Sequence, residues 1–212
     1  LIIGHCVMGK GARKADGSSY ECNCATHGAP LGGDAYINTI KNLGGDPENA
    51  FVVFPEVQEM YCRRAEELKQ IVAQRYAEKA EWAKGHPVQA KQLEEWFSGK
   101  VSEIDWTKVE QKAGAATRGA SATVLGVLAE QVPNMIVASA DLSNSDKTDG
   151  FLKKTHELMR GDFTGAFFQA GVAELTMVCC CIGMALHGGV IPACGTFFVF
   201  SDYMKPAVRM AA

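Results

Sequence analysis

The sequence contains one carboxylate in an unusually apolar stretch. Glu174 opens a segment that runs to Leu186 without another charged residue, and Phe167 and Phe168 precede it closely. A carboxylate among apolar side chains must find a hydrogen-bond donor or hold its proton more tightly than usual, which makes Glu174 a candidate for proton transfer. The alternative is a first-turn glutamate that the amide groups of its own helix stabilise, and its position alone favours this alternative.

Three aromatic residues follow a short turn near the end of the sequence. Phe197, Phe200 and Tyr203 are spaced three residues apart, directly after Gly195 and Thr196. Such a stripe can form the wall of a pocket for a flat aromatic ligand. A stripe with helical spacing can also pack into an ordinary core, and the spacing by itself favours the core.

Other residues that could bind a polar ligand occur in loops and at a helix start. His27 lies in a glycine-rich loop without bulky apolar neighbours, so it is a candidate for ligand binding. Arg118 opens a helix and Ser145 closes a polar loop. Because helix starts and guanidinium groups suit phosphate, either residue could meet an anion.

The eight cysteines indicate a reduced protein. Secreted disulfide frameworks are small and dense in cysteine, and this chain of 212 residues is neither. Cys22, Cys24 and His27 could hold a metal ion, but a fourth ligand at a suitable spacing is missing. The sequence therefore predicts free thiols, no metal site within the chain and a cytoplasmic location.

Strands and helices alternate in the second half of the sequence. The apolar run at residues 135–138 is typical of a strand buried on both faces, and a polar loop containing Asp141 and Ser145 follows it. The alternation predicts an α/β fold with a largely parallel sheet, in which ligands bind beyond the carboxyl ends of the strands. The expected strands are at 1–5, 135–138, 163–169 and 190–191, the helices at 56–84, 88–98, 116–130, 148–158, 174–186 and 201–212, the long loop at 6–33 and the linker at 99–113.

Composition and charge exclude several classes of protein. Apolar residues make up 47% and charged residues 21%, a balance that excludes wholesale disorder. The 21 basic and 24 acidic residues give a net charge of −3, and without a Lys/Arg-rich run we expect no nucleic-acid partner. The longest apolar run, at residues 177–186, is too short to span a bilayer, so we expect no membrane partner. The chain starts without methionine and stops within a helical pattern, so we expect it to be part of a longer protein.

Several short motifs occur in a fixed order along almost the whole chain, and together they resemble the middle of a transketolase. They are His27-Gly-Ala-Pro-Leu31, Thr117-Arg118, Ser139-Ala-Asp-Leu142, Gly171-Val-Ala-Glu174, Ala185-Leu-His-Gly-Gly189 with Pro192, Gly195-Thr-Phe197, Phe200-Ser-Asp-Tyr203 and Pro206-Ala-Val-Arg209. The resemblance implies a parallel-sheet thiamine diphosphate-binding fold that is incomplete here and includes a helical linker region. It assigns residues 1–85 to the end of the diphosphate-binding domain, 86–112 to the interdomain linker and 113–212 to the front of the pyrimidine-binding domain.

The resemblance also implies an activity. Transketolases use thiamine diphosphate and a divalent metal ion, Mg²⁺ or Ca²⁺, to transfer a two-carbon ketol unit from a ketose phosphate to an aldose phosphate in the pentose phosphate pathway. Their active site lies at the interface of a homodimer, so the implied partners are sugar phosphates and a second subunit. The metal ligands of the family fall outside this segment.

The matching motifs carry the family's functional roles over to particular positions. Glu174 would face the pyrimidine of the cofactor and promote its activation, and His27 would contact the diphosphate and the substrate hydroxyls. The pyrimidine pocket would comprise Phe197, Phe200 and Tyr203, the other cofactor contacts would be Asp141 and Ile3, and the substrate phosphate would bind Arg118 and Ser145.

The sequence departs from the family pattern at three points. Many members read Gly-Val-Arg-Glu-His where this chain has Gly171-Val-Ala-Glu-Leu175, and the loop between Gly4 and His27 is longer than usual. The Gly-Asp-Gly…Asn signature for metal and diphosphate is absent. Two alternatives therefore stay open: a related thiamine-dependent synthase or dehydrogenase, and a non-catalytic module derived from such an enzyme.

Overall fold

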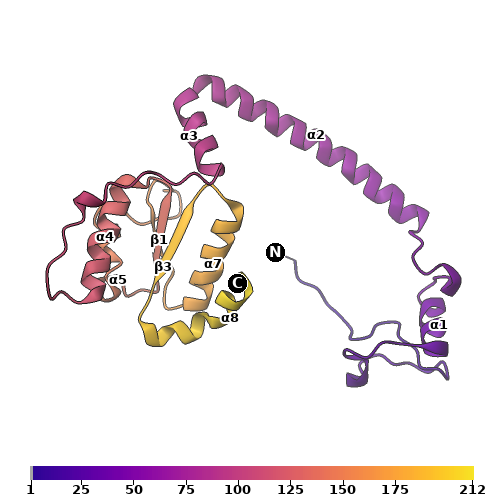
Figure 1. The fold of residues 1–212 in the computed structure, drawn as a ribbon. Coiled ribbons are helices and arrows are strands. Elements are labelled where there is room, and N and C mark those ends of the chain that lie inside the picture. Colours follow the sequence, from indigo (N-terminus) through magenta and orange to yellow (C-terminus); the bar gives the residue numbers. More distant parts are fainter. Residues whose placement is uncertain (1) are drawn as a thin grey trace. The chain divides into compact units, whose positions relative to one another are not determined.

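The computed structural model describes residues 2–212, which form two compact units (Figure 1). The first unit extends to Tyr76 and the second begins at Ala77. Within the described residues, no helix combines the length and the apolar character that crossing a membrane requires.

The first unit consists of an irregular segment packed against one short helix. The irregular segment contains turns and the 3₁₀ helix η1 (Cys24–Thr26), in agreement with the long loop that the sequence predicts. Helix α1 (Gly33–Asn42) holds it in place, because Thr39 Oγ1 accepts a hydrogen bond from the backbone of Arg13 at 2.9 Å. Asn42 Nδ2 donates a second one to the carbonyl oxygen of Gly11 at 3.0 Å.

The strand expected at the start of the chain is wrong for the residues that the structure describes. Residues 2–5 have no regular secondary structure, and Ile2 and Ile3 are 98% and 75% exposed. Leu1 lies outside the described residues. A short apolar segment forms a strand only where a neighbouring strand accepts and donates its backbone hydrogen bonds, and within residues 2–212 none does.

Two helices that begin with proline follow the first unit's loop and the 3₁₀ helix η2 (Pro47–Asn49). Proline suits the first turn of a helix, and α2 (Pro55–Gly85) and α3 (Pro87–Phe97) confirm the helices expected at 56–84 and 88–98. No residue of α2 is buried among the described residues. Its charged side chains form exposed ion pairs one turn apart, such as Arg64–Glu67 at 2.8 Å, which contribute little to stability.

The second unit is organised around a three-stranded parallel sheet. Strand β1 (Met135–Ser139) lies in the centre, with β2 (Phe167–Gln169) on one side and β3 (Ile191–Gly195) on the other. In this register Val137 pairs with both Phe167 and Ala193. The α/β fold with a parallel sheet is therefore confirmed.

Helices cover both faces of this sheet (Figure 1). Consecutive side chains of a strand point to opposite faces, so Val137 packs in one cluster with Leu125 of α4, and Ala138 packs in another with Met177 of α7. Besides α3, the helices of this unit are η3 (Trp106–Lys108), α4 (Thr117–Gln131), α5 (Ser143–Asp146), α6 (Asp149–Leu152), α7 (Glu174–His187), η4 (Phe198–Phe200) and α8 (Ser201–Ala211).

The segment between α6 and β2 differs from the expectation. The helix expected at 148–158 ends at Leu152, and the strand expected at 163–169 begins only at Phe167. The chain turns back between them, and the backbone of Leu158 donates to the carbonyl oxygen of Phe167 at 2.7 Å. Gly165 permits this close approach, because a Cβ there would lie 2.4 Å from the carbonyl oxygen of Glu157. Backbone pairing with β2 thus replaces the additional helical turns.

Candidate functional site

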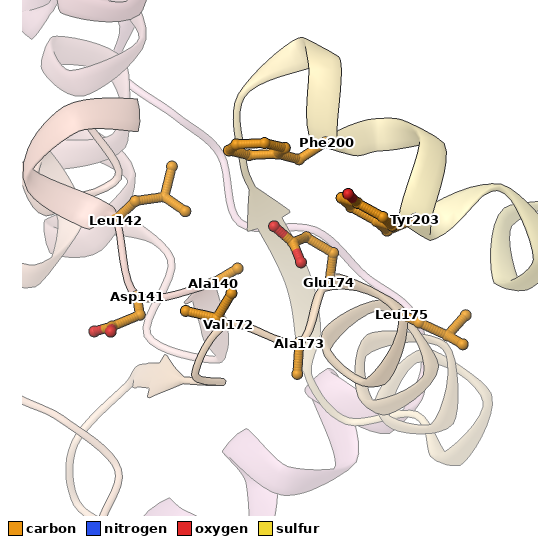
Figure 2. Close-up of a pocket in the computed structure, with 9 residues that line it drawn as sticks. All are labelled: Ala140, Asp141, Leu142, Val172, Ala173, Glu174, Leu175, Phe200 and Tyr203. Carbon is orange, nitrogen blue, oxygen red and sulfur yellow. The ribbon is translucent and has the colours of Figure 1, made fainter.

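A cavity of about 550 Å³ lies beyond the carboxyl ends of the strands, beside the start of α7 (Figure 2). This is the edge of the sheet where the sequence predicts a ligand site. The lining is mostly apolar, with two carboxylates and two aromatic rings. Its residues are Ala140, Asp141, Leu142, Val172, Ala173, Glu174, Leu175, Phe200 and Tyr203.

Glu174 directs a buried carboxylate into this cavity. It is the first residue of α7 and only 7% exposed, and Figure 2 shows its carboxylate pointing toward the rings of Phe200 and Tyr203. The described residues offer this carboxylate no hydrogen bond or ion pair. The first-turn explanation requires bonds from the helix's own amides, and this geometry lacks them. The carboxylate therefore faces the cavity without a partner among the described residues.

The three aromatic residues stack in sequence along η4 and α8. The ring centroids of Phe197 and Phe200 are 6.1 Å apart, and those of Phe200 and Tyr203 are 6.3 Å apart, with 28° between the planes in each pair. Phe200 and Tyr203 line the cavity, whereas Phe197 does not line it. Tyr203 is 63% exposed, so this stripe forms a wall rather than a core.

Asp141 lies at the opposite side of the cavity from these rings. It follows β1 directly and adopts a left-handed backbone conformation, with φ of 65°, that L residues rarely take. Figure 2 shows its carboxylate pointing away from Glu174. The two carboxylates therefore do not form a pair, and only Glu174 faces the aromatic wall.

A second cavity, of about 390 Å³, is lined by Arg118, one of the two residues expected to bind phosphate, whereas Ser145 does not line it. Arg118 lines it from α4, and its Nη1 donates a hydrogen bond to the carbonyl oxygen of Ser145 at 3.1 Å. Asp146 and Thr148 line the same cavity. Thr196 also lines it, and its Oγ1 is buried without a partner among the described residues. The α4 start and the loop after β1 thus converge on one polar pocket.

Two other predicted site residues belong to the first unit. His27 is exposed and ends η1, where its backbone donates a hydrogen bond to the carbonyl oxygen of Cys24 at 3.1 Å. Ile3 is likewise exposed. Neither lines the cavities of the second unit, and the roles of both stay predictions.

All eight cysteines are free thiols, as the sequence predicts. In the part of the chain that the structure describes, no group of three or more His, Cys, Asp or Glu side chains could hold a metal ion. Sequence reasoning missed one pair, Cys181 of α7 and Cys194 of β3, which share a hydrogen bond. This bond, with burial, raises the pKa of the Cys181 thiol, and it lowers the pKa of Cys194 to about 7.

The fold and the cavity define a class of protein: a parallel α/β domain with a small-ligand cavity at the carboxyl ends of its strands. Two family models extend this assignment to most of the chain. Residues 1–102 match the thiamine diphosphate binding domain of transketolase, and residues 113–212 match the pyrimidine binding domain of transketolase. The chain belongs to the transketolase family.

Curated relatives and solved structures agree with this membership. The transketolase of Bacillus subtilis is 35% identical over 217 residues, covering 100% of this chain and 31% of the relative, and that of Aquifex aeolicus is 40% identical over 189 residues, covering 88% and 27%. The transketolase structure from Leishmania mexicana has a TM-score of 0.80 at 28% identity and covers 92% of this chain and 29% of its own. A structure from Pichia stipitis, in complex with sedoheptulose 7-phosphate, has a TM-score of 0.77 at 30% identity and covers 92% and 30%. This chain thus spans less than a third of the length of each of these proteins.

Proposed function

We propose that this chain is a segment of a thiamine diphosphate-dependent transketolase, which transfers a two-carbon ketol unit from a ketose phosphate to an aldose phosphate in the pentose phosphate pathway. The observation that carries the proposal is the buried, unpartnered carboxylate of Glu174, which faces two aromatic rings in a domain of the pyrimidine-binding family. The sedoheptulose 7-phosphate bound to the Pichia stipitis relative supports sugar phosphates as the substrate class.

The cavity's residues fit the pyrimidine ring of thiamine diphosphate. A carboxylate without a protein donor suits a ring nitrogen that can share a proton with it, and the rings of Phe200 and Tyr203 suit stacking on a flat heterocycle. Bound thiamine diphosphate supplies the nucleophilic carbon that carries the two-carbon unit. The Glu174 carboxylate holds and returns a proton at the ring nitrogen, while Phe200, Tyr203 and Leu142 exclude water from it.

The second cavity would bind the phosphate group of the sugar. The Arg118 guanidinium lines this cavity and lies within hydrogen-bond distance of the loop that carries Ser145. A guanidinium and a hydroxyl are donors that suit phosphate oxygens. We assign His27 to the diphosphate and the substrate hydroxyls, Asp141 and Ile3 to further cofactor contacts and Phe197 to support of Phe200. A divalent ion, Mg²⁺ or Ca²⁺, would be held by ligands other than the residues described here.

The same proposal covers the organisation of the complete protein. Residues 1–85 form the end of the diphosphate-binding domain, residues 86–112 the linker and residues 113–212 the front of the pyrimidine-binding domain. The enzyme would be a homodimer, because the cofactor is shared between the first domain of one subunit and the second domain of its partner. Its proposed location is the cytoplasm.

An assay of the full-length protein tests the proposed function. The protein is freed of cofactor and then incubated with xylulose 5-phosphate and ribose 5-phosphate, with and without thiamine diphosphate and Mg²⁺. We expect sedoheptulose 7-phosphate and glyceraldehyde 3-phosphate only when the cofactor is added. Absence of these products from a folded, cofactor-loaded protein would overturn the proposal, and a different product would favour a related thiamine-dependent synthase or dehydrogenase.

A further inference from the structure

The loop between β1 and α6 is held by a carboxylate that the proposed mechanism does not use. Asp146 Oδ2 accepts a hydrogen bond from Ser139 Oγ at 2.9 Å. Its other oxygen, Oδ1, accepts from the backbone nitrogen and from Oγ1 of Thr148, both at 2.8 Å. Ser139 is 0% and Thr148 is 5% exposed, so the donors are fixed in the interior of the unit. These hydrogen bonds are partly buried, and hydrogen bonds to a carboxylate are among the strongest that a side chain makes.

These bonds close the loop into a ring. Ser139, the last residue of β1, donates to Asp146 through its Oγ, and the same oxygen accepts a hydrogen bond from the backbone nitrogen of Leu142 at 3.4 Å. The carbonyl oxygen of Leu142 accepts in turn from the backbones of Ser145 and Asp146, at 2.8 and 2.9 Å. The hydrogen bonds thus run from Ser139 to Asp146, from Asp146 to Leu142 and from Leu142 back to Ser139.

The ring carries residues of both cavities. Asp141 and Leu142 line the first cavity, and Ser145 accepts the hydrogen bond from Arg118 beside the second. Asp141 has a left-handed backbone, which persists only where neighbouring contacts impose it. If the hydrogen bonds of Asp146 were lost, the loop would open, and both Asp141 and Ser145 would be displaced.

The end of β3 leaves this loop no room to shift toward the sheet. A Cβ at Gly195 would lie 2.5 Å from Thr148 Cγ2 and 3.6 Å from Asp146 Oδ2. The loop thus packs directly against the strand backbone. Asp146 and Thr148 are thus held between the close contact with β3 and the hydrogen bond that Ser139 of β1 donates to Asp146.

We propose that Asp146 is a positioning residue, which fixes the loop after β1 so that Asp141 meets the cofactor and Ser145, with Arg118, meets the phosphate of the sugar. This inference rests on the proposed function and adds a residue that couples its two pockets. Asp146 lines the second cavity, but both of its carboxylate oxygens already accept hydrogen bonds from Ser139 or Thr148. Its effect passes through Ser139 and Thr148 to the loop backbone.

Substitutions in the full-length protein test the coupling with two readouts. One is the calorimetric Kd for thiamine diphosphate. The other is the ratio of kcat/KM for ribose 5-phosphate to that for ribose, which isolates recognition of the phosphate. Asp146→Ala should raise the Kd and lower the ratio, each by about tenfold, because the loop loses three hydrogen bonds to a charged acceptor. Asp146→Asn should recover most of both, because its amide oxygen still accepts from Thr148.

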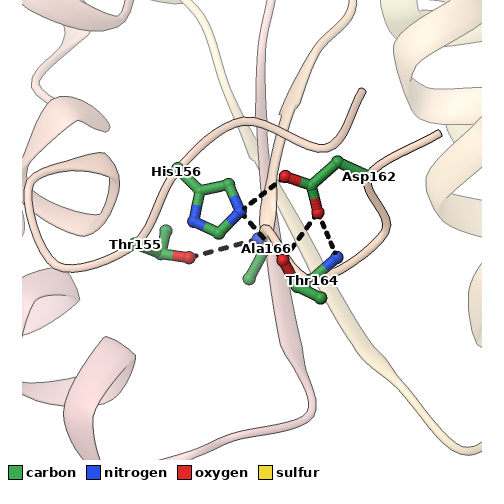
Figure 3. A network of polar contacts seen from close by, with 5 residues as sticks. All are labelled: Thr155, His156, Asp162, Thr164 and Ala166. Carbon is green, nitrogen blue, oxygen red and sulfur yellow. Dashed lines mark hydrogen bonds and ion pairs between the residues drawn. The ribbon is translucent and has the colours of Figure 1, made fainter. Parts of the chain in front are cut away.

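The chain offers a matched control away from both cavities (Figure 3). Asp162 accepts from the backbone nitrogen and Oγ1 of Thr164 at 3.0 and 2.6 Å, the same local pattern as Asp146 with Thr148, and its Oδ2 lies 3.3 Å from His156 Nε2. It lies in the exposed turn before β2. Asp162→Ala removes the same kind of turn and should leave both readouts within about twofold of wild type.

The possible results separate this inference from the proposed function. Asp146→Ala with both readouts unchanged contradicts the positioning role, as does an equal effect of Asp162→Ala. If Asp146→Ala does not fold, Thr148→Val removes one donor and should move both readouts in the same direction by about threefold, and no movement contradicts the role. A wild-type protein that transfers no ketol unit overturns both proposals, whereas an active wild type with an indifferent Asp146 overturns only this one.

Discussion

Replacing Glu174 by glutamine removes its proton-accepting oxygen and its charge but keeps its shape. In the full-length protein, we expect Glu174→Gln to lower kcat by about 100-fold or more, because a positioned acid–base group contributes roughly 10²–10⁴-fold to rate. A hundredfold loss corresponds to about 2.7 kcal/mol of transition-state stabilisation. The same change should not destabilise the protein, because it removes a charge that is 7% exposed and has no partner among the described residues.

The assay measures kcat with saturating xylulose 5-phosphate, ribose 5-phosphate and cofactor, together with the thermal midpoint of the cofactor-free protein. Glu94→Gln, an exposed glutamate on α3, is the control and should leave both unchanged. The reasoning is refuted if Glu174→Gln keeps more than about a third of wild-type kcat. It is also refuted if the thermal midpoint falls as activity falls, since that pairing indicates a carboxylate needed for folding.

Three further outcomes follow from the geometry. Phe200→Ala should weaken thiamine diphosphate binding by about tenfold in calorimetry through loss of stacking, and an unchanged Kd would remove this ring from the pocket. The rate of Cys194 alkylation should rise with pH, with a midpoint of about 7, because Cys181 donates a hydrogen bond to the Cys194 thiolate. Cys181→Ala should move the midpoint of this pH profile toward 9. Equal midpoints in the two proteins would contradict the shared hydrogen bond. Gly150→Ala should destabilise the protein by about 2 kcal/mol or more in denaturant unfolding, because its Cβ would lie 2.2 Å from a carbonyl oxygen of α4, whereas Gly119→Ala, with open space around it, should not.

Elements with a strong local signal could be predicted from the sequence. The apolar run at residues 135–138 forms the central strand, and the uncharged segment after Glu174 forms α7. Both could be predicted because segment length and hydropathy distinguish a short buried strand from a longer buried helix. The predicted strand at residues 1–5 and the overlong helix after Thr148 failed for one reason. Whether an apolar or helical segment keeps its structure depends on backbone partners elsewhere in the chain, and local pattern does not contain them.

The candidate site was partly predictable for the same reason. Spacing placed Phe200 and Tyr203 on one face of a helix, and the structure brings Glu174 to that face. Asp146 was missed, because a polar residue in a polar loop carries no hydropathy signal. The spacing of Asp146 and Thr148 is the one available clue, since an aspartate often accepts from the backbone two residues further on.

The central claim is that the Glu174 carboxylate moves a proton on thiamine diphosphate bound in the cavity. The most direct test follows exchange of the cofactor's C2 proton for deuterium on the full-length protein, with wild type and Glu174→Gln both saturated with cofactor. We predict exchange at least about 100-fold slower in Glu174→Gln. Equal exchange rates in the two proteins would contradict the account.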